Sequence, residues 1–152
     1  MEIETREEQP YAAVRDTVTL ETFAKIADRF GEVMQWLADR ELPILGAPFF
    51  RYLRVTDDGQ YEVEAAIPTI AVVPAAGEVF CATLPAGRYA VEVHEGHPDG
   101  LIEVTARILG EDLQFDRDGD AWGARLETFF TDPAVQPDSS KWTTEVAIRL
   151  VD

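Results

Sequence analysis

One carboxylate in this sequence stands among aromatic side chains. Glu127 falls in the stretch Arg-Leu-Glu-Thr-Phe-Phe at residues 125 to 130, shortly after Trp122. A single negative charge among aromatic rings is an environment that attracts an organic cation. The alternative is that Glu127 faces water or pairs with Arg125, as carboxylates on strands commonly do. The residues alone leave the two interpretations equally open.

Other chemistry has weaker support. His94 and His97 stand beside Glu95 and Asp99, but a metal site there would need more ligands than the sequence supplies nearby. We therefore expect a loop hydrogen-bonded to its own backbone, and no metal. Because no Gly-rich phosphate loop, nucleophile elbow or paired-cysteine motif occurs, we expect no cofactor.

Aromatic residues are numerous enough to line a pocket and to stack on a flat ligand. Each of them taken singly is more typical of a core than of a contact. Beside Glu127, which is also the candidate catalytic residue, the predicted ligand-binding residues are Trp36, Phe50, Tyr52, Tyr89, Trp122, Phe129 and Trp142.

Composition limits the partners. The 152 residues are 46% hydrophobic, enough for the core of one domain, and 29 acidic against 13 basic residues give a formal net charge of −16. Such a surface repels nucleic-acid phosphate and mildly favours cationic ligands. We expect a small organic partner and no direct contact with nucleic acid.

No export or membrane insertion is expected. The acidic N-terminus lacks the basic flank and apolar run of a secretory signal. The longest apolar stretch, residues 67 to 76, contains two prolines and is too short to cross a bilayer. Together with the single cysteine, Cys81, these features predict a cytoplasmic protein.

The elements that must position these residues follow from hydrophobic periodicity. Apolar residues step by three or four over residues 19 to 39, which predicts one helix with Thr19 as its cap, and a second helix follows residues 98 to 100 and reaches Leu113. A period of two predicts strands over residues 11–16, 49–55, 61–67, 77–84, 89–93, 123–130 and 142–150.

The chain also contains two similar halves. The aligned stretches are residues 30–36 with 109–115, 46–49 with 123–126, and 61–67 with 142–148. The second alignment sets Phe50 against Glu127, 77 residues apart, and the third sets Glu64 against Glu145, which we interpret as scaffold. Glycines at matching helix positions, Gly31 and Gly110, suggest close backbone packing there.

These patterns predict one α+β domain over residues 1–152. Two pseudo-symmetric strand-helix-strand-strand repeats, about 8–76 and 77–152, should form a curved antiparallel sheet with two main helices and a central cleft. The Phe-to-Glu difference breaks the symmetry where that cleft should lie.

The order of several phrases resembles the GyrI-like small-molecule-binding family. They are Leu-Pro-Ala-Gly-Arg-Tyr-Ala at 84–90, His-Glu-Gly at 94–96, Glu-Thr-Phe-Phe-Thr-Asp-Pro at 127–133 and Trp-Thr-Thr-Glu-Val at 142–146. The family is similar to the effector-binding domains of AraC-type and MerR-type transcription activators. Here we expect a stand-alone domain without a DNA-binding segment.

By this resemblance Glu127 is the counter-ion of a bulky, often cationic aromatic ligand, and Trp142 is an aromatic pocket position. Some stand-alone members of the family hydrolyse strained cyclopropane rings, which a buried Glu could assist. Two departures, His97-Pro98 in place of Pro-Tyr and Phe129 in place of Tyr, remove phenol hydroxyls near the site. Binding is therefore favoured over catalysis, because Glu127 has fewer hydrogen-bond partners.

Three functions remain as hypotheses. The first is cytoplasmic binding of amphipathic or cationic aromatic molecules, including multidrug or effector binding and protective sequestration. The second is a cofactor-independent hydrolase of cyclopropanoid natural products that uses Glu127. The third is a protein-binding inhibitor of gyrase type, whose acidic surface imitates nucleic acid.

Overall fold

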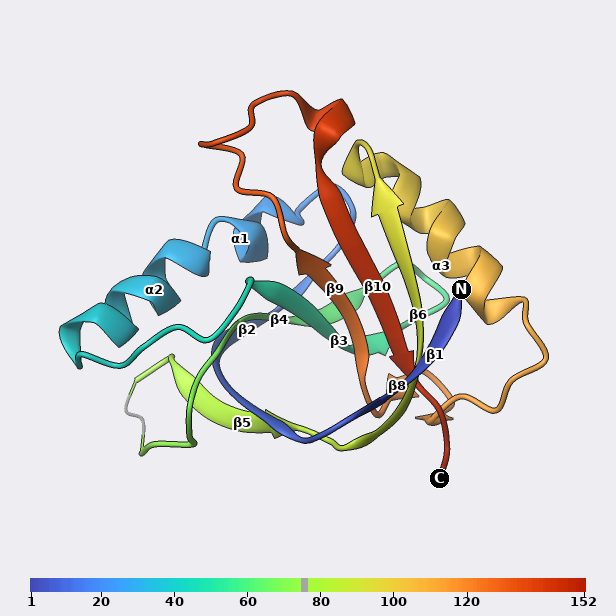
Figure 1. Cartoon of the computed structure of the whole chain (residues 1–152), viewed down its shortest axis with the longest axis horizontal. Coiled ribbons are helices and arrows are strands. Elements are labelled where there is room, and N and C mark those ends of the chain that lie inside the picture. Colours follow the sequence, from blue (N-terminus) through green and yellow to red (C-terminus); the bar gives the residue numbers. More distant parts are fainter. Residues whose placement is uncertain (75–76) are drawn as a thin grey trace.

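One curved antiparallel sheet carries the whole fold in the computed structural model, which describes residues 1–74 and 77–152 (Figure 1). Its strands are β1 (Glu2–Arg6), β2 (Gln9–Val18), β3 (Phe49–Val55), β4 (Tyr61–Pro68), β5 (Phe80–Leu84), β6 (Gly87–Glu95), β7 (Arg117–Asp118), β8 (Ala121–Trp122), β9 (Arg125–Phe129) and β10 (Thr143–Arg149). All seven predicted strands are present. The predicted α+β class, with a curved antiparallel sheet, is confirmed.

The strand order shows the pseudo-symmetry of the two halves. Along the main path it reads β1-β6-β10-β9-β3-β4-β2-β5, so β3 and β9 form the centre and each outer strand has a counterpart at the other end. The edge strands are exchanged, because β1 pairs with β6 of the second half and β5 pairs with β2 of the first. Neither half therefore completes its sheet alone.

The exchanged strand β1 was not predicted. Its sequence, Glu-Ile-Glu-Thr-Arg, has one apolar residue, so it carries almost no hydrophobic alternation. Its backbone pairing with β6, from Glu2 opposite Val91 to Arg6 opposite Gly87, makes it a strand. The predicted repeat boundaries stay a prediction, and the end of the first repeat, at about residue 76, lies outside the described residues.

The helices are α1 (Ala24–Ala27), α2 (Phe30–Asp39) and α3 (Leu101–Leu109). The prediction of one continuous helix over residues 19 to 39 is wrong. At the break the Arg29 amide donates to the Ile26 carbonyl at 3.0 Å, a tighter turn that redirects the chain so that Ile26 and Leu37 both stay buried on the curving sheet. Thr19 does not cap a helix, because α1 begins at Ala24 and Phe23 occupies its N-cap position.

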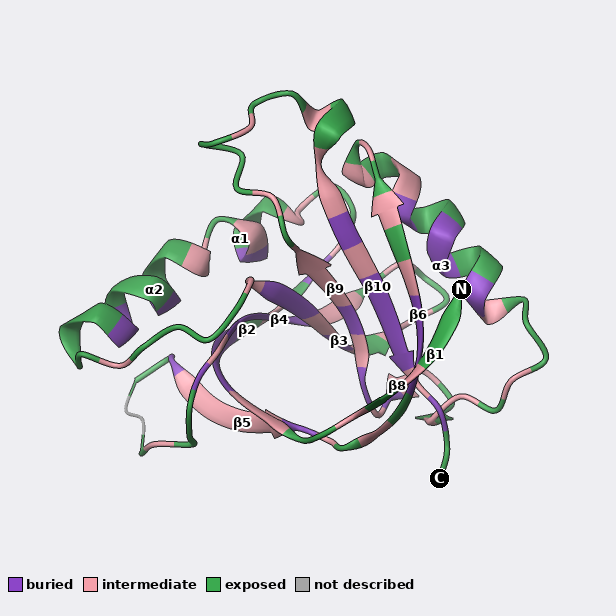
Figure 2. Cartoon of the chain, in the orientation of Figure 1, coloured by how far each residue is buried: buried purple, intermediate pink, exposed green. Residues whose placement is uncertain are grey.

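Helices α1, α2 and α3 lie on the same face of the sheet. In the sheet's first half, alternate residues such as Phe50 and Tyr52 point into a core with α1 and α2, while α3 packs on the second half (Figure 2). Residues between them, such as Phe49 and Leu126, form a separate core on the opposite face. A residue's strand position therefore decides whether it can face the space between the helices.

Glu64 and Glu145, which the repeat alignment makes equivalent, lie on the face of the sheet opposite the helices. Glu64 is 1% exposed, accepts a hydrogen bond from the Tyr11 hydroxyl at 2.5 Å and pairs with Arg15 at 2.7 Å. Glu145 pairs with Arg6 at 2.7 Å. Each carboxylate is engaged by a guanidinium within the fold, in keeping with a scaffold role.

Among the described residues, no helix has both the length and the apolar character needed to span a bilayer.

The helix alignment of the repeats is wrong. Gly31 lies in the first turn of α2, whereas Gly110 caps the end of α3, so the two glycines hold different positions. A Cβ atom added at Gly31 would meet no atom within 4 Å, and one at Gly110 would meet only the carbonyls of its own helix. Close backbone packing is therefore not the reason for either glycine.

We expect Gly31→Ala to stabilise the protein. The site has room for a methyl group, and alanine restricts the unfolded chain more than glycine does, so the free energy of unfolding should rise by about 0.5 to 1 kcal/mol. Urea denaturation followed by circular dichroism measures it. Gly100→Ala is the contrasting variant, because its Cβ would stand 2.5 Å from the His94 ring. Destabilisation by Gly31→Ala would contradict this interpretation.

Candidate ligand-binding site

The centre of the site lies where the sheet's two halves pair with each other. β3 and β9 run antiparallel, with Phe49 opposite Thr128, Phe50 opposite Glu127 and Arg51 opposite Leu126. Phe50 and Glu127 are also the residues that the repeat alignment makes equivalent. A residue that pairs with its own repeat equivalent lies on the pseudo-twofold axis, so the Phe-to-Glu difference falls on that axis.

Alternation along the strands brings three polar groups to the helix side of the sheet. Arg125 and Glu127 are two residues apart on β9 and share that face with Tyr52 of β3. The Tyr52 hydroxyl donates a hydrogen bond to Glu127 Oε1 at 2.5 Å. Glu127 is half-buried, and within the described residues its carboxylate makes no ion pair with Arg125. Glu127 is therefore neither fully exposed to water nor paired with Arg125.

Burial dominates the electrostatics of this pair. It raises the pKa of Glu127 above 4.5, while the hydrogen bond from Tyr52 and the charge of Arg125 oppose that shift. Burial also raises the pKa of Tyr52 well above 10, and the nearby Glu127 charge adds to the shift. Tyr52 therefore keeps its proton and acts as the donor.

A hollow of about 240 Å³ opens over Glu127 between the two halves. Its first-half wall comes from the turn before α1 and from β3 and β4, and its second-half wall from α3 and β9. The lining residues are Leu20, Phe23, Tyr52, Tyr61, Ile102, Thr105, Arg125 and Glu127. The predicted central cleft is thus present, and it holds the carboxylate.

A row of aromatic rings bounds this hollow. Phe50 is at its centre, with its ring centroid 5.1 Å from that of Phe23 and 5.1 Å from that of Phe129, both edge to face. Phe30 lies 5.0 Å from Phe50 on the side of α2. These contacts make a continuous apolar wall on one side of the carboxylate.

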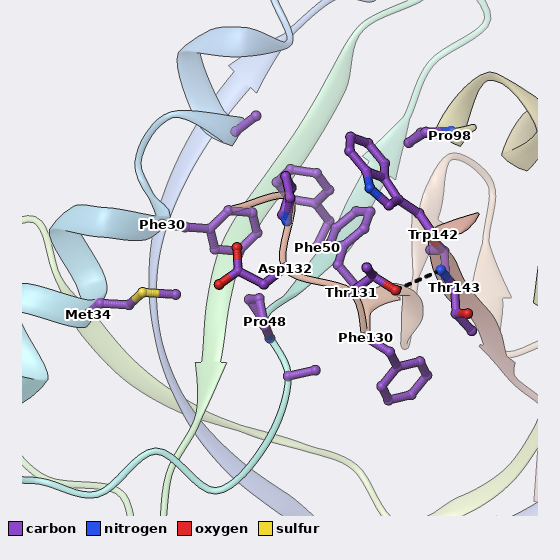
Figure 3. A pocket seen from close by; sticks show the side chains of 15 residues that line it. Phe30, Met34, Pro48, Phe50, Pro98, Phe130, Thr131, Asp132, Trp142 and Thr143 are labelled. Carbon is purple, nitrogen blue, oxygen red and sulfur yellow. Dashed lines mark hydrogen bonds between the residues drawn. The ribbon is translucent and has the colours of Figure 1, made fainter. Parts of the chain in front are cut away.

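A second, larger hollow of about 560 Å³ lies beyond that wall and does not contain Glu127. Figure 3 shows Phe30 and Met34 reaching it from α2 and Trp142 from the position just before β10, with Asp132 between them. Its lining is apolar apart from Asp132 and three threonines. We place the functional centre at the smaller hollow, because the half-buried, hydrogen-bonded carboxylate lies there.

The structure brings some of the predicted residues together and leaves others apart. Glu127 and Tyr52 line the smaller hollow, and Phe50, Phe129 and Trp142 line the larger one. Three predicted residues lie elsewhere: Trp36 in the core under α2, Trp122 in the core under α3, and Tyr89 on the opposite face of the sheet. Ligand contact stays a prediction for all eight.

Sequence reasoning missed several lining residues. Phe23, Tyr61 and Thr105 come from three separate elements, and no pattern in the sequence connects them. Arg125 could have been found, because it stands two positions before Glu127 on the same strand and so must share its face. The expectation that Phe129 leaves Glu127 short of hydroxyl partners is corrected by Tyr52, which supplies one from β3.

The two histidines serve the loop after β6. His94 Nε2 lies 3.0 Å from the His97 carbonyl, and His97 Nδ1 accepts the Asp99 amide at 3.1 Å, as expected for a loop bonded to its own backbone. The His97 ring stacks on the Trp142 ring, with 6.4 Å between the two ring centroids. Within the described part of the chain, no group of three or more His, Cys, Asp or Glu side chains comes close enough to hold a metal ion.

Solved structures show the same fold. EcmrR in its complex with DNA has a TM-score of 0.80 at 16% identity over 99% of this chain, which spans 57% of the EcmrR chain. The EcmrR C-terminal domain has a TM-score of 0.79 at 16% identity, covering 99% of this chain and 96% of that domain. SAV2435 bound to tetraphenylphosphonium has a TM-score of 0.63 at 15% identity, covering 99% and 93%.

Sequence comparison shows the family. No curated protein matches the chain in sequence. The family model of the GyrI-like small molecule binding domain matches residues 1–151, nearly the whole chain. The chain therefore belongs to the family of GyrI-like small molecule binding domains.

Proposed function

We propose that this domain binds small amphipathic aromatic molecules that carry a positive charge, with Glu127 as their counter-ion. The observation that carries the proposal is one half-buried carboxylate on the pseudo-twofold axis, held by Tyr52 and bounded by aromatic rings. The gyrase-type inhibitor hypothesis stays a prediction on which these contacts do not bear.

The physical argument rests on desolvation. Burial of the carboxylate costs free energy in the unliganded protein, since one phenol hydroxyl replaces only part of its hydration. A weakly hydrated organic cation offsets that cost without losing much hydration of its own. Rings such as Phe23 and Tyr61 add cation–π attraction and apolar contact.

Ligand size also follows from the geometry. A molecule larger than about 240 Å³ must displace part of the aromatic row, and the larger hollow lies directly beyond Phe50. The smaller hollow thus takes the charged group and the larger one an apolar body. The tetraphenylphosphonium bound to SAV2435 is a bulky aromatic cation and supports this ligand class.

We expect Glu127→Gln to weaken tetraphenylphosphonium binding about tenfold, because the desolvated charge is lost while the amide oxygen still accepts from Tyr52. Isothermal titration calorimetry measures it. Glu145→Gln is the matched control, since it removes one carboxylate on the opposite face and should leave the affinity unchanged. Equal affinity in wild type and Glu127→Gln, with both proteins folded, rejects Glu127 as the counter-ion.

The affinity should also depend on pH. Because burial raises the pKa of Glu127, the carboxyl gains a proton as the pH falls through a value above 4.5, and affinity for the cation is lost over that range. Tetraphenylphosphonium does not titrate, so the change belongs to the protein. Glu127→Gln should bind equally over the same range. The raised pKa of Glu127 also affects the folding of the unliganded protein. Protonation of Glu127 stabilises the folded state at a pH below that pKa, and this contribution to the free energy of unfolding is lost as the pH rises through it.

A second candidate is hydrolysis of strained, electrophilic natural products, favoured by the contact between Tyr52 and Glu127. Glu127 would take a proton from water as the water oxygen bonds to a cyclopropane carbon. The strained carbon–carbon bond then breaks, and its electron pair passes to a conjugated carbonyl of the substrate, which takes a proton from solvent while Glu127 releases its own proton to solvent. A raised pKa brings Glu127 closer to the range in which a general base works well.

The hydrolase hypothesis predicts that a cyclopropane-bearing alkylator gains the mass of one water in the presence of the wild-type protein. Glu127→Gln should slow that conversion by a factor of about 100 or more, and Tyr52→Phe should slow it less. Mass spectrometry over time measures both rates. Recovery of unchanged substrate from the wild-type protein rejects the hydrolase and leaves the binding proposal intact.

A further inference from the structure

The hollow over Glu127 also contains a guanidinium. Arg125 lines the same hollow, two residues before Glu127 on β9. Over residues 1–74 and 77–152 its side chain makes neither a hydrogen bond nor an ion pair, and only charges at longer range act on it. Other partly buried arginines are engaged: Arg149 pairs with Asp116 at 2.9 Å, and Arg51 donates to Tyr11 and to the Gly123 carbonyl.

Two aromatic rings hold Arg125 in place. Its guanidinium carbon lies 5.0 Å from the centre of the Trp122 ring and 5.6 Å from that of Tyr52. Contacts of this kind are electrostatic and give none of the five N–H donors an oxygen or nitrogen acceptor. The side chain is thus positioned while its hydrogen-bonding capacity remains open.

An unpaired guanidinium in such a place is costly. Burial lowers the pKa of Arg125, and the charge of Glu127 only partly offsets the loss of hydration. A ligand that is only a cation would pair with Glu127 but meet repulsion from Arg125. A ligand that also carries an acceptor group would satisfy both side chains.

We propose that Arg125 is a specificity residue that binds an anionic group of the ligand, so that the preferred ligand is an aromatic zwitterion with a cationic group and a carboxylate. This inference rests on the proposed function, because it places the cationic group at Glu127. Residues two apart on a strand are separated by about 7 Å, which sets the order of the distance between the ligand's two charges. A molecule the size of an aromatic amino acid suits the hollow of about 240 Å³.

A matched pair of probes tests the inference. N,N,N-trimethyltryptophan is a permanent cation with a carboxylate, and its methyl ester is the same cation without the negative charge. We expect the wild-type protein to bind the zwitterion about tenfold more tightly than the ester, as a charge-assisted contact implies. Titration calorimetry at pH 7.5 measures both affinities.

Arg125→Gln should abolish this preference, because binding of the zwitterion becomes weaker and binding of the ester becomes tighter. Arg117→Gln is the matched control, because Arg117 lies over the same Trp122 ring at 4.2 Å but is exposed and outside the hollow. Its preference should equal that of the wild type. If Arg125→Gln does not fold, the wild-type preference for one probe over the other decides.

The outcomes separate the two proposals. If the wild type binds the ester as tightly as the zwitterion, or if Arg125→Gln keeps the wild-type preference, Arg125 only balances the charge of Glu127 and the inference is overturned. If neither probe binds while tetraphenylphosphonium binds through Glu127, the inference is also overturned and the proposed function stands. If the wild type binds neither of the two probes nor tetraphenylphosphonium, both the inference and the proposed function are overturned.

Discussion

Direct pairing of β3 with β9 is the constraint on which the rest of the molecule depends. Because the two strands are repeat equivalents, the residues at their midpoint meet each other across the axis. Two glutamates at positions 50 and 127 would repel each other, and two phenylalanines would leave no negative charge in the cleft. One of each produces an apolar wall with a single carboxylate beside it, which only departure from symmetry allows.

The two faces of the sheet differ in how completely their charged side chains are paired. On the face away from the helices, Glu64 and Glu145 are held by Arg15 and Arg6 above a core of their own. On the helix side, as far as the described residues show, Glu127 has one hydroxyl partner and Arg125 lies over aromatic rings without a hydrogen-bond partner. The second arrangement leaves charged groups incompletely paired at a cost in stability, which is the usual condition of a ligand site and agrees with the proposed function.

Much of the fold could be predicted because its hydrophobic patterns are strong. The seven predicted strands carry a period of two over most of their length, and β4 and β10 align as predicted. The prediction of one continuous helix over residues 19 to 39 failed. Hydrophobic periodicity shows which face of a helix is apolar, but it does not detect a tighter turn such as the one at Arg29. The edge strand β1 was not predicted because its pairing with β6, and not its own composition, makes it a strand.

The sequence by itself determined the fold class, the internal duplication and a position, Glu127, at which a carboxylate in one half stands against an aromatic residue in the other. These are properties of residues near one another along the chain or at a fixed spacing. Only the tertiary structure decided which groups meet that carboxylate, because Tyr52 and Phe23 come from β3 and from the turn before α1, far from it in sequence. Trp36, Trp122 and Tyr89 were equally plausible partners by residue type. Helix packing placed Trp36 in the core under α2, and the positions of their strands placed Trp122 under α3 and Tyr89 on the opposite face, all of which depend on the whole fold.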